Sequence, residues 1–99
     1  MEIKNIQDGS TLTLTVSGRL DTTTAPQLEG VLKHSINGVT SLVFDFTDLE
    51  YISSAGLRVL LAAAKVMAKQ GTMSIQHPNE TVNDVFEVTG MDSFLNIVK

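Results

Sequence analysis

The sequence of 99 residues contains no cysteine, no tryptophan and only two prolines. Without cysteine, the chain has neither a disulfide framework nor a thiolate metal site. No apolar run approaches the roughly 20 residues that span a bilayer, and the N-terminus lacks the basic and apolar regions of a signal peptide. These absences predict a cytoplasmic protein with no membrane attachment.

Basic residues are also few, at seven against 11 acidic ones, which gives a formal net charge of −4. This charge argues against a nucleic-acid surface and is compatible with a basic or apolar protein partner. The hydrophobic content of 42% and the charged content of 18% are ordinary for a soluble globular protein. The length predicts a single domain over residues 1–99, with a modest core and no elaborate active-site cavity. We expect neither a cofactor nor a metal ion.

The most informative stretch runs from Ser41 to Gln70. Residues 41–46 are nearly all apolar, a pattern typical of a central strand covered on both faces. Residues 57–70 have a helical period. Its two predicted faces are an apolar one with Leu57, Leu60, Leu61, Ala64, Met67 and Ala68, and an opposite one with Arg58, Ala62, Lys65 and Lys69. The turn between strand and helix carries two hydroxyls, Ser53 and Ser54.

A serine at a helix N-terminus has two possible roles. Its oxygen caps the helix by accepting a hydrogen bond from a backbone N–H group, and either Ser53 or Ser54 would satisfy this role. The same position favours negative charge, because the free N–H groups and the helix dipole are positive there. A phosphoryl group, which adds about 1.5 to 2 negative charges, would therefore be tolerated without loss of the helix. From spacing alone, simple capping is the favoured explanation.

The remaining segments alternate between strand and helix signals. The Asp8-Gly9 turn predicts an antiparallel pair of strands at the start of the chain. Thr24, Pro26 and Gln27 form a capping-box pattern for a first helix, which ends at Asn37-Gly38. Further signals predict a strand at 72–75, a helix closed by Gly90 and a last strand at 94–98. The order implies right-handed crossovers. The predicted fold class is α/β, with a mixed, mostly parallel sheet opened by an antiparallel pair and packed against helices.

Two strings resemble a known family. Residues 51–61, YISSAGLRVLL, resemble the signature of STAS domains, specifically the small single-domain bacterial anti-sigma factor antagonists. Residues 18–25, GRLDTTTA, resemble the second recurring segment of that family. The similarity covers essentially the whole chain and implies a STAS-like fold. In the family, a partner kinase phosphorylates the serine two positions before the motif glycine, which corresponds to Ser54. Ser53 is the runner-up, since it stands where the family often has aspartate.

The resemblance implies a phosphorylation-switched binding module. The unphosphorylated domain would sequester an anti-sigma factor with serine kinase activity and so free a sigma factor for transcription. Phosphorylation of Ser54 would release that partner, and a serine phosphatase would reverse the step. The alternative is a STAS adaptor in another partner-switching pathway, in signalling or secretion. The candidate partner-binding residues are Asp21, Thr22, Thr23, Asp48, Ser53, Ser54, Gly56, Leu57, Arg58 and Leu61.

Carboxylates also occur near the predicted site. From the residues alone, Asp21 is equally a functional group or a local turn former, and the resemblance places it beside the phosphorylation site. We expect Asp45, Asp48 and Glu50 to crowd the approach to Ser54, so that phosphate would join an acidic rim.

An enzyme is the competing hypothesis. Ser54-Ala55-Gly56 is similar to half of a hydrolase nucleophile elbow, but Ile52 stands where that motif has glycine. The candidate bases are His34, inside the first helix, and His77, whose neighbour Pro78 favours a simple turn. No phosphate-binding glycine loop with lysine is present. We therefore predict that the chain has no catalytic residues.

Overall fold

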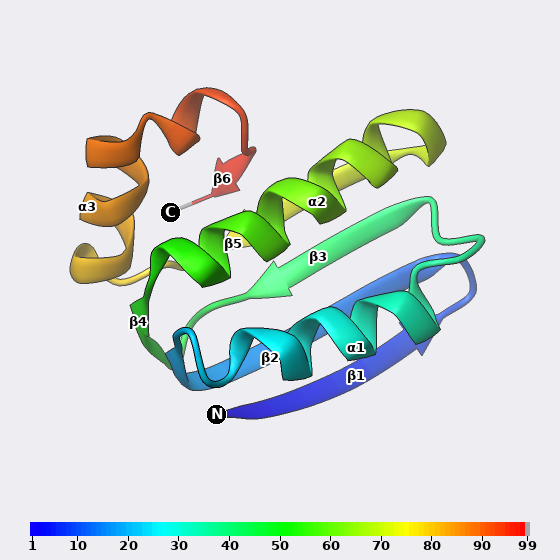
Figure 1. Cartoon of the computed structure of the whole chain (residues 1–99). Coiled ribbons are helices and arrows are strands. Elements are labelled where there is room, and N and C mark those ends of the chain that lie inside the picture. Colours follow the sequence, from blue (N-terminus) through cyan, green and yellow to red (C-terminus); the bar gives the residue numbers. More distant parts are fainter. Residues whose placement is uncertain (99) are drawn as a thin grey trace.

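The structure is a computed structural model that describes residues 1–98. Its strands are β1 (Glu2–Asp8), β2 (Thr11–Leu20), β3 (Ser41–Asp45), β4 (Leu49–Ile52), β5 (Thr72–Gln76) and β6 (Ile97–Val98). Its helices are α1 (Ala25–Ser35), α2 (Ser54–Gln70), α3 (Glu80–Thr89) and the short 3-10 helix η1 (Met91–Ser93). The sheet order is β1-β2-β3-β5-β6, and β4 pairs separately with β2 (Figure 1). Only the β1–β2 pair is antiparallel among these described strands, which confirms the predicted fold class.

Strand β2 is longer than predicted and changes partner along its length. Its first half pairs with β3 as far as Thr15 and Asp45, and its end pairs with β4 from Gly18 to Leu20. The register shifts between Gly18 and Arg19, and Gly18 has a φ of 87°, a left-handed conformation that glycine adopts at no steric cost. The prediction that the chain leaves the strand at Gly18 is wrong, because β4, which sequence analysis missed, gives the end of β2 a second partner.

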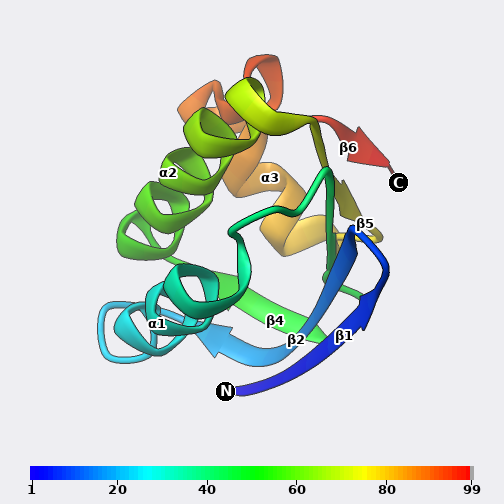
Figure 2. The same cartoon turned by 90° about the vertical axis from the view of Figure 1, so that its right-hand side faces the viewer.

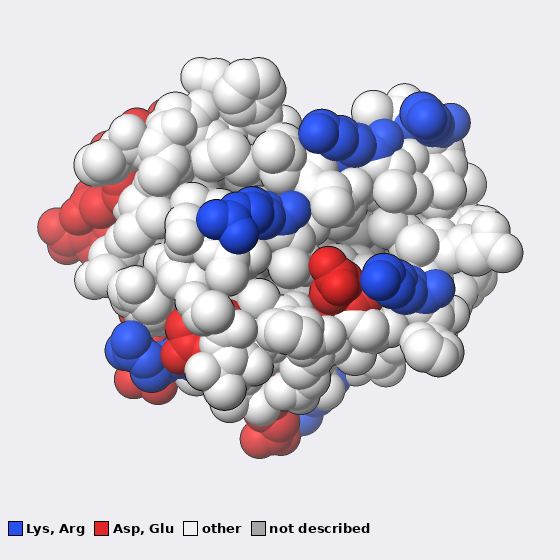
Figure 3. Space-filling view, in the orientation of Figure 1, with Lys and Arg blue, Asp and Glu red and all other residues white. Residues whose placement is uncertain are grey.

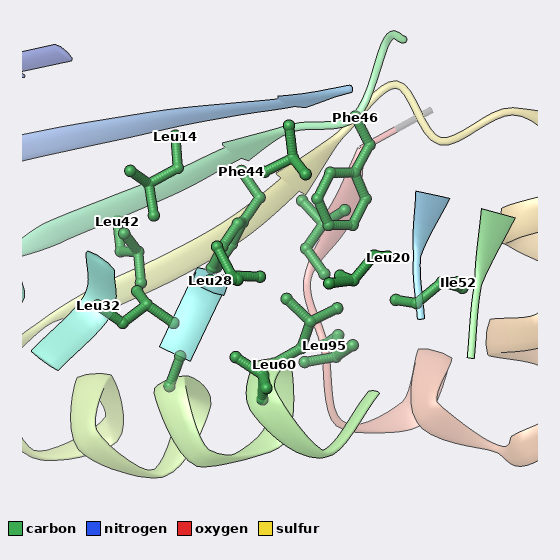
Figure 4. Close-up of a cluster of buried hydrophobic side chains, with 14 of the residues drawn as sticks. Leu14, Leu20, Leu28, Leu32, Leu42, Phe44, Phe46, Ile52, Leu60 and Leu95 are labelled. Atoms are coloured by element: carbon green, nitrogen blue, oxygen red, sulfur yellow. The ribbon is translucent and has the colours of Figure 1, made fainter. Parts of the chain in front are cut away.

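The core lies on one face of the sheet. Helices α1 and α2 lie side by side on this face (Figure 2), and apolar side chains from both layers meet there (Figure 4). In β3, Leu42 and Phe44 are buried, whereas Ser41, Val43 and Asp45 on the other face are only half-buried. The expectation that this strand is covered on both faces is therefore wrong. Its apolar run reflects one buried face and a single valine on the open one.

Helix α2 buries a different stripe from the predicted one. Val59 and Ala63 are buried and were not assigned to the apolar face, while Ala68 is exposed and Leu61 is half-buried. The stripe is displaced because α2 packs against the sheet below and α1 beside it. Arg58, Ala62, Lys65 and Lys69 are exposed, as predicted.

The C-terminal segment is less regular than predicted. The last strand covers only Ile97–Val98, because Met91–Ser93 form η1 and Phe94 closes that turn with its N–H donating to Met91 O. Among residues 1–98, no helix is both long enough and apolar enough to cross a bilayer.

Candidate functional site

The start of α2 assigns different roles to the two neighbouring serines. Ser53 has an extended backbone, its Oγ accepts a hydrogen bond from Gly56 N at 3.5 Å, and its carbonyl accepts from Leu57 N at 3.0 Å. Ser53 is therefore the N-cap. Ser54 is the first helical residue and is exposed, and its hydroxyl takes part in none of the hydrogen bonds within residues 1–98. The capping role, which the sequence left open between the two serines, belongs to Ser53.

The end of β2 lies directly beside this helix start. Ser53 N donates a hydrogen bond to Leu20 O at 2.9 Å, so Asp21 follows immediately next to the cap. Gly56 makes this close approach possible. A Cβ atom at this position would lie 2.7 Å from Leu20 Cγ and 2.9 Å from Ile52 Cγ1. Gly56 is therefore a packing residue, buried between α2 and the ends of β2 and β4.

Asp21 organises the turn that leads into α1. Its Oδ1 accepts hydrogen bonds from Thr23 N at 3.0 Å and Thr24 N at 3.1 Å. The Thr24 hydroxyl donates to Arg19 O at 2.8 Å and accepts from Asp21 N at 2.9 Å. The backbone N–H of Thr24 is the main reason that the pKa of the Asp21 carboxyl is lowered, with desolvation opposing it. The predicted capping box is wrong, because Thr24 makes no side-chain cap and its hydroxyl is used within this turn instead.

A shallow hollow joins the two helix starts. It has a volume of about 220 Å³ and is lined by Thr22, Ala25, Pro26, Glu29, Ala55, Arg58 and Val59. Thr22 and its chain neighbour Thr23 are exposed, and Arg58 is exposed one turn after Ser54. The structure therefore brings together Asp21, Thr22, Ser53, Ser54 and Arg58, which sequence analysis had selected from separate segments. We call this group the α2-start site.

The predicted acidic rim is wrong for Asp48. Asp48 O accepts a hydrogen bond from Gly18 N at the far end of β4, and the four residues of β4 separate Asp48 from Ser53 by roughly 16 Å. Asp45 is engaged by Thr47, whose hydroxyl donates to it at 2.6 Å and is the main cause of the lowered pKa of this carboxyl. Glu50 is exposed within β4. Helix α2 itself contains no acidic residue, so the charged group of this helix nearest to Ser54 is the cationic Arg58.

Two residues predicted to bind the partner, Leu57 and Leu61, are less exposed than expected. Leu57 is only 7% exposed and belongs to the core, so the expectation that it contributes exposed surface is wrong. Leu61 is half-buried and lines a separate hollow with Met91 and Phe94. Among Leu57, Arg58 and Leu61, only Arg58 therefore faces solvent at the α2-start site.

Sequence reasoning missed one pair of residues beside the site. The guanidinium carbon of Arg19 lies 4.3 Å from the centroid of the Tyr51 ring, and Arg19 Nε lies 3.9 Å from Asp21 Oδ2. Such a cation–π contact orients the exposed arginine next to the turn. Arg19 of β2 pairs with Tyr51 of β4, so the contact could not be predicted without recognising that residues 49–52 form a strand.

The histidines lie elsewhere. Asn79 Nδ2 donates to Leu49 O at 3.0 Å, which places the segment after β5, including His77, at the end of β4 away from Ser54. His77 instead contributes to the lowered pKa of the Asp45 carboxyl. His34 contacts Gly30 O within α1. No histidine in the described chain is therefore positioned as a base for Ser54. Within residues 1–98, no group of three or more potential ligands could hold a metal ion.

A small mixed sheet with helices on one face, and an exposed serine after a capped helix start, define a STAS-type domain. The model of the STAS domain family matches residues 2–99, and the chain belongs to this family. BtrV of Bordetella bronchiseptica, assigned by name to the anti-sigma factor antagonists, is 38% identical over 84 residues, which cover 83% of this chain and 70% of BtrV. The anti-sigma-B factor antagonist of Bacillus subtilis is 25% identical over 92 residues, with 92% and 84% of the two chains covered.

Solved structures show the same fold. The unphosphorylated form of the anti-sigma factor antagonist SpoIIAA superposes with a TM-score of 0.84 at 20% identity, over 99% of this chain and 89% of that one. An anti-sigma factor antagonist from Mycobacterium paratuberculosis gives a TM-score of 0.89 at 22% identity, over 98% and 84%.

Proposed function

We propose that this chain is an anti-sigma factor antagonist whose partner binding is switched by phosphorylation of Ser54. The relatives named above support the first part, and SpoIIAA of Bacillus has been solved in unphosphorylated and phosphorylated forms. One observation of this structure carries the second part. The Ser54 hydroxyl is exposed at the first position of α2 and is not used as the helix cap.

The surroundings of Ser54 suit a phosphate group. The first N–H groups of a helix lack intrahelical acceptors, and the helix dipole makes this end positive. Arg58 lies four residues further along α2, a spacing at which oppositely charged side chains pair on a helix surface. Phosphate would therefore be held locally, and it would turn a neutral hydroxyl into a group of about two negative charges without unfolding the helix.

The proposed partner is an anti-sigma factor that is also a serine kinase. It would dock on the α2-start site, and Asp21, Thr22, Thr23 and Arg58 would surround Ser54 in the interface. The kinase would then transfer the γ-phosphoryl group of ATP to Ser54 Oγ, releasing ADP and a proton, and a serine phosphatase would hydrolyse the phosphoserine. A tenfold loss of affinity needs only about 1.4 kcal/mol, and one unfavourable charge in an interface costs several kcal/mol. A single phosphate is therefore sufficient for release. The chain acts here as ligand and substrate and contributes no catalytic residue.

Phosphate mapping tests the modified residue. The chain is incubated with ATP and the serine kinase encoded by the same organism, and the phosphopeptide is sequenced by mass spectrometry. We expect phosphate on Ser54, none on Ser54→Ala, and normal labelling of Ser53→Asn, which keeps a good cap but has no hydroxyl. Phosphate on Ser53 alone would overturn the residue assignment.

Calorimetric titration with the anti-sigma factor tests the switch. We expect the phosphorylated chain to bind at least about tenfold more weakly than the unmodified chain, and Ser54→Ala to bind normally in the presence of ATP. Equal affinity of the phosphorylated and unmodified chains would refute the switch. Normal switching with a partner that binds no sigma factor would favour an adaptor in another pathway.

A further inference from the structure

Strand β1 is a free edge of the sheet. Among the described strands it pairs only with β2, in an unbroken antiparallel register from Glu2 and Ser17 to Asp8 and Thr11. Its other side forms the lower border of the molecule in Figure 1. Six of its seven residues are exposed, and Ile6 is 57% exposed. The strand has neither a proline nor a bulge, so its unpaired N–H and C=O groups can pair with a further strand.

The side chains of β1 determine which strand fits this edge. Lys4, Ile6 and Asp8 lie on the open face of the sheet, because the residues of β2 that pair with them alternate with the buried ones. Neither Lys4 nor Asp8 forms a salt bridge within residues 1–98. Figure 3 shows basic and acidic side chains next to each other along the lower border, where Figure 1 draws β1. A like charge directly opposite either residue would oppose pairing, so the added strand needs an acidic group opposite Lys4 and a basic group opposite Asp8.

We propose that β1 pairs with β1 of a second copy, which makes a homodimer with one continuous sheet. In a two-fold symmetric antiparallel pair, residues at equal distances before and after the axis lie opposite each other. With the axis at Ile6, Lys4 of each copy lies opposite Asp8 of the other, so two pairs of opposite charge form. The two Ile6 side chains meet between these pairs on the open face, and Asn5 lies opposite Gln7. The second copy is the occupant that fits, because β1 itself supplies both groups that the edge needs.

Charge selects this register from the alternatives. Only the two-fold axes at Lys4, Asn5 and Ile6 pair five or more residues of β1. An axis at Lys4 places two lysines opposite each other. An axis at Asn5 places Glu2 opposite Asp8 at both ends of the pair. Like charges directly opposite each other destabilise a strand pair and opposite charges stabilise it, so the axis at Ile6 is favoured.

Charge reversals test this proposal in analytical ultracentrifugation. We expect the wild type to dimerise with a dissociation constant below about 1 mM. Lys4→Asp and Asp8→Lys each place like charges opposite each other, so each variant alone should dimerise at least about tenfold more weakly than the wild type. Mixed together, the two variants restore two pairs of opposite charge, so a heterodimer should form. Ile6→Glu places two carboxylates at the axis and should also weaken the dimer by at least about tenfold.

Glu2→Lys is the matched control. It makes the same change of charge as Asp8→Lys on the same strand, but in the proposed register it lies opposite Ser10, beyond the end of β1. It should therefore dimerise as the wild type does. With the axis at Asn5 it would instead lie opposite Asp8 and strengthen the dimer, which would overturn the proposed register.

Circular dichroism checks that each variant keeps its fold. Asp8 adjoins the turn at Gly9, so if Asp8→Lys fails to fold, Lys4→Asp and Ile6→Glu at exposed strand positions carry the test. A wild type that sediments as a monomer up to about 1 mM would overturn the proposal. Dimerisation of Lys4→Asp and Ile6→Glu at the wild-type level, or a mixture of folded variants that stays monomeric, would also overturn it.

The dimer and the proposed switch are tested separately. Ile6 pairs with Thr13 in the first half of β2, whereas the α2-start site lies beyond the last residue of this strand, Leu20. Ser54→Ala should therefore dimerise as the wild type does.

Discussion

Gly56→Ala tests whether the contact between α2 and the strand ends determines where the site lies. Two effects oppose each other in this variant. Alanine is the better helix former by about 0.8–1 kcal/mol. The new methyl group, however, would meet Leu20 Cγ at 2.7 Å and Ile52 Cγ1 at 2.9 Å, closer than carbon atoms approach. Both neighbours belong to the core, with Leu20 0% and Ile52 1% exposed.

Overpacking of this kind costs about 1–3 kcal/mol, so it exceeds the helix gain and Gly56→Ala should be destabilised by up to about 2 kcal/mol. Gly30→Ala is the matched control. Gly30 lies inside α1, and a Cβ atom there meets nothing within 4 Å. It should gain about 0.5–1 kcal/mol because only the helix effect remains.

Urea unfolding followed by circular dichroism measures both variants. The two free energies of unfolding should differ by about 1–3 kcal/mol, which corresponds to melting temperatures at least about 4 °C apart for a domain of this size. If Gly56→Ala proved as stable as Gly30→Ala, the helix start would have room to move, and the argument that Gly56 fixes the α2-start site would fail.

Three further outcomes follow from individual contacts. Asn79→Ala should lose about 1–3 kcal/mol in urea unfolding, because the side chain both caps α3 at Val82 N (2.8 Å) and bonds Leu49 O (3.0 Å), whereas Asn79→Asp keeps the cap and should lose less. The lowered pKa of Asp21 means that its stabilising contribution is full above the unfolded pKa of about 3.9 and is lost as pH falls through the folded pKa. Stability should therefore fall less steeply in acid for Asp21→Asn than for the wild type, and parallel pH profiles would contradict this. Phosphorylation of Ser54 should change the melting temperature by no more than a few degrees, and cooperative unfolding on modification would contradict the role given to the helix start.

The local elements were predictable because their signals are contained in short stretches. The Asp8-Gly9 turn, the helix over residues 57–70 and the end of α3 at Gly90 each depend on residues within one or two turns, and all occur in the structure. The position of Ser54 after an apolar strand and before a helix was visible for the same reason. The sequence did not show which serine caps the helix, because either serine could do so. Only the extended backbone conformation of Ser53 assigns the cap to this residue.

Several errors have a different physical cause, which is pairing between distant segments. Strand β2 extends beyond the end of β3, and β4 pairs with this extension. Residues 49–52 alone do not reveal that they form a strand, because their pairing partner lies far away in the sequence. The extended conformation of β4 places Asp48 at the end of this strand away from Ser54, and it places the Tyr51 ring against the Arg19 guanidinium. The Thr24 capping box fails for a local reason, because Asp21 Oδ1 accepts hydrogen bonds from Thr23 N and Thr24 N and the Thr24 hydroxyl is used within this turn. The unrecognised strand thus accounts for the misplacement of Asp48 and for the missed contact between Arg19 and Tyr51.

The arrangement of the α2 start is the reason that the proposed switch would act on a partner without changing the fold. Ser53 supplies the cap, Ser54 supplies a free hydroxyl, and Gly56 supplies the close packing that holds both beside the Asp21 turn. Because no hydrogen bond of the described chain uses the Ser54 hydroxyl, its modification would break none of them. In the proposed switch, the new charge would weaken binding of the partner that covers Ser54, while the core of leucine and phenylalanine side chains would stay unchanged.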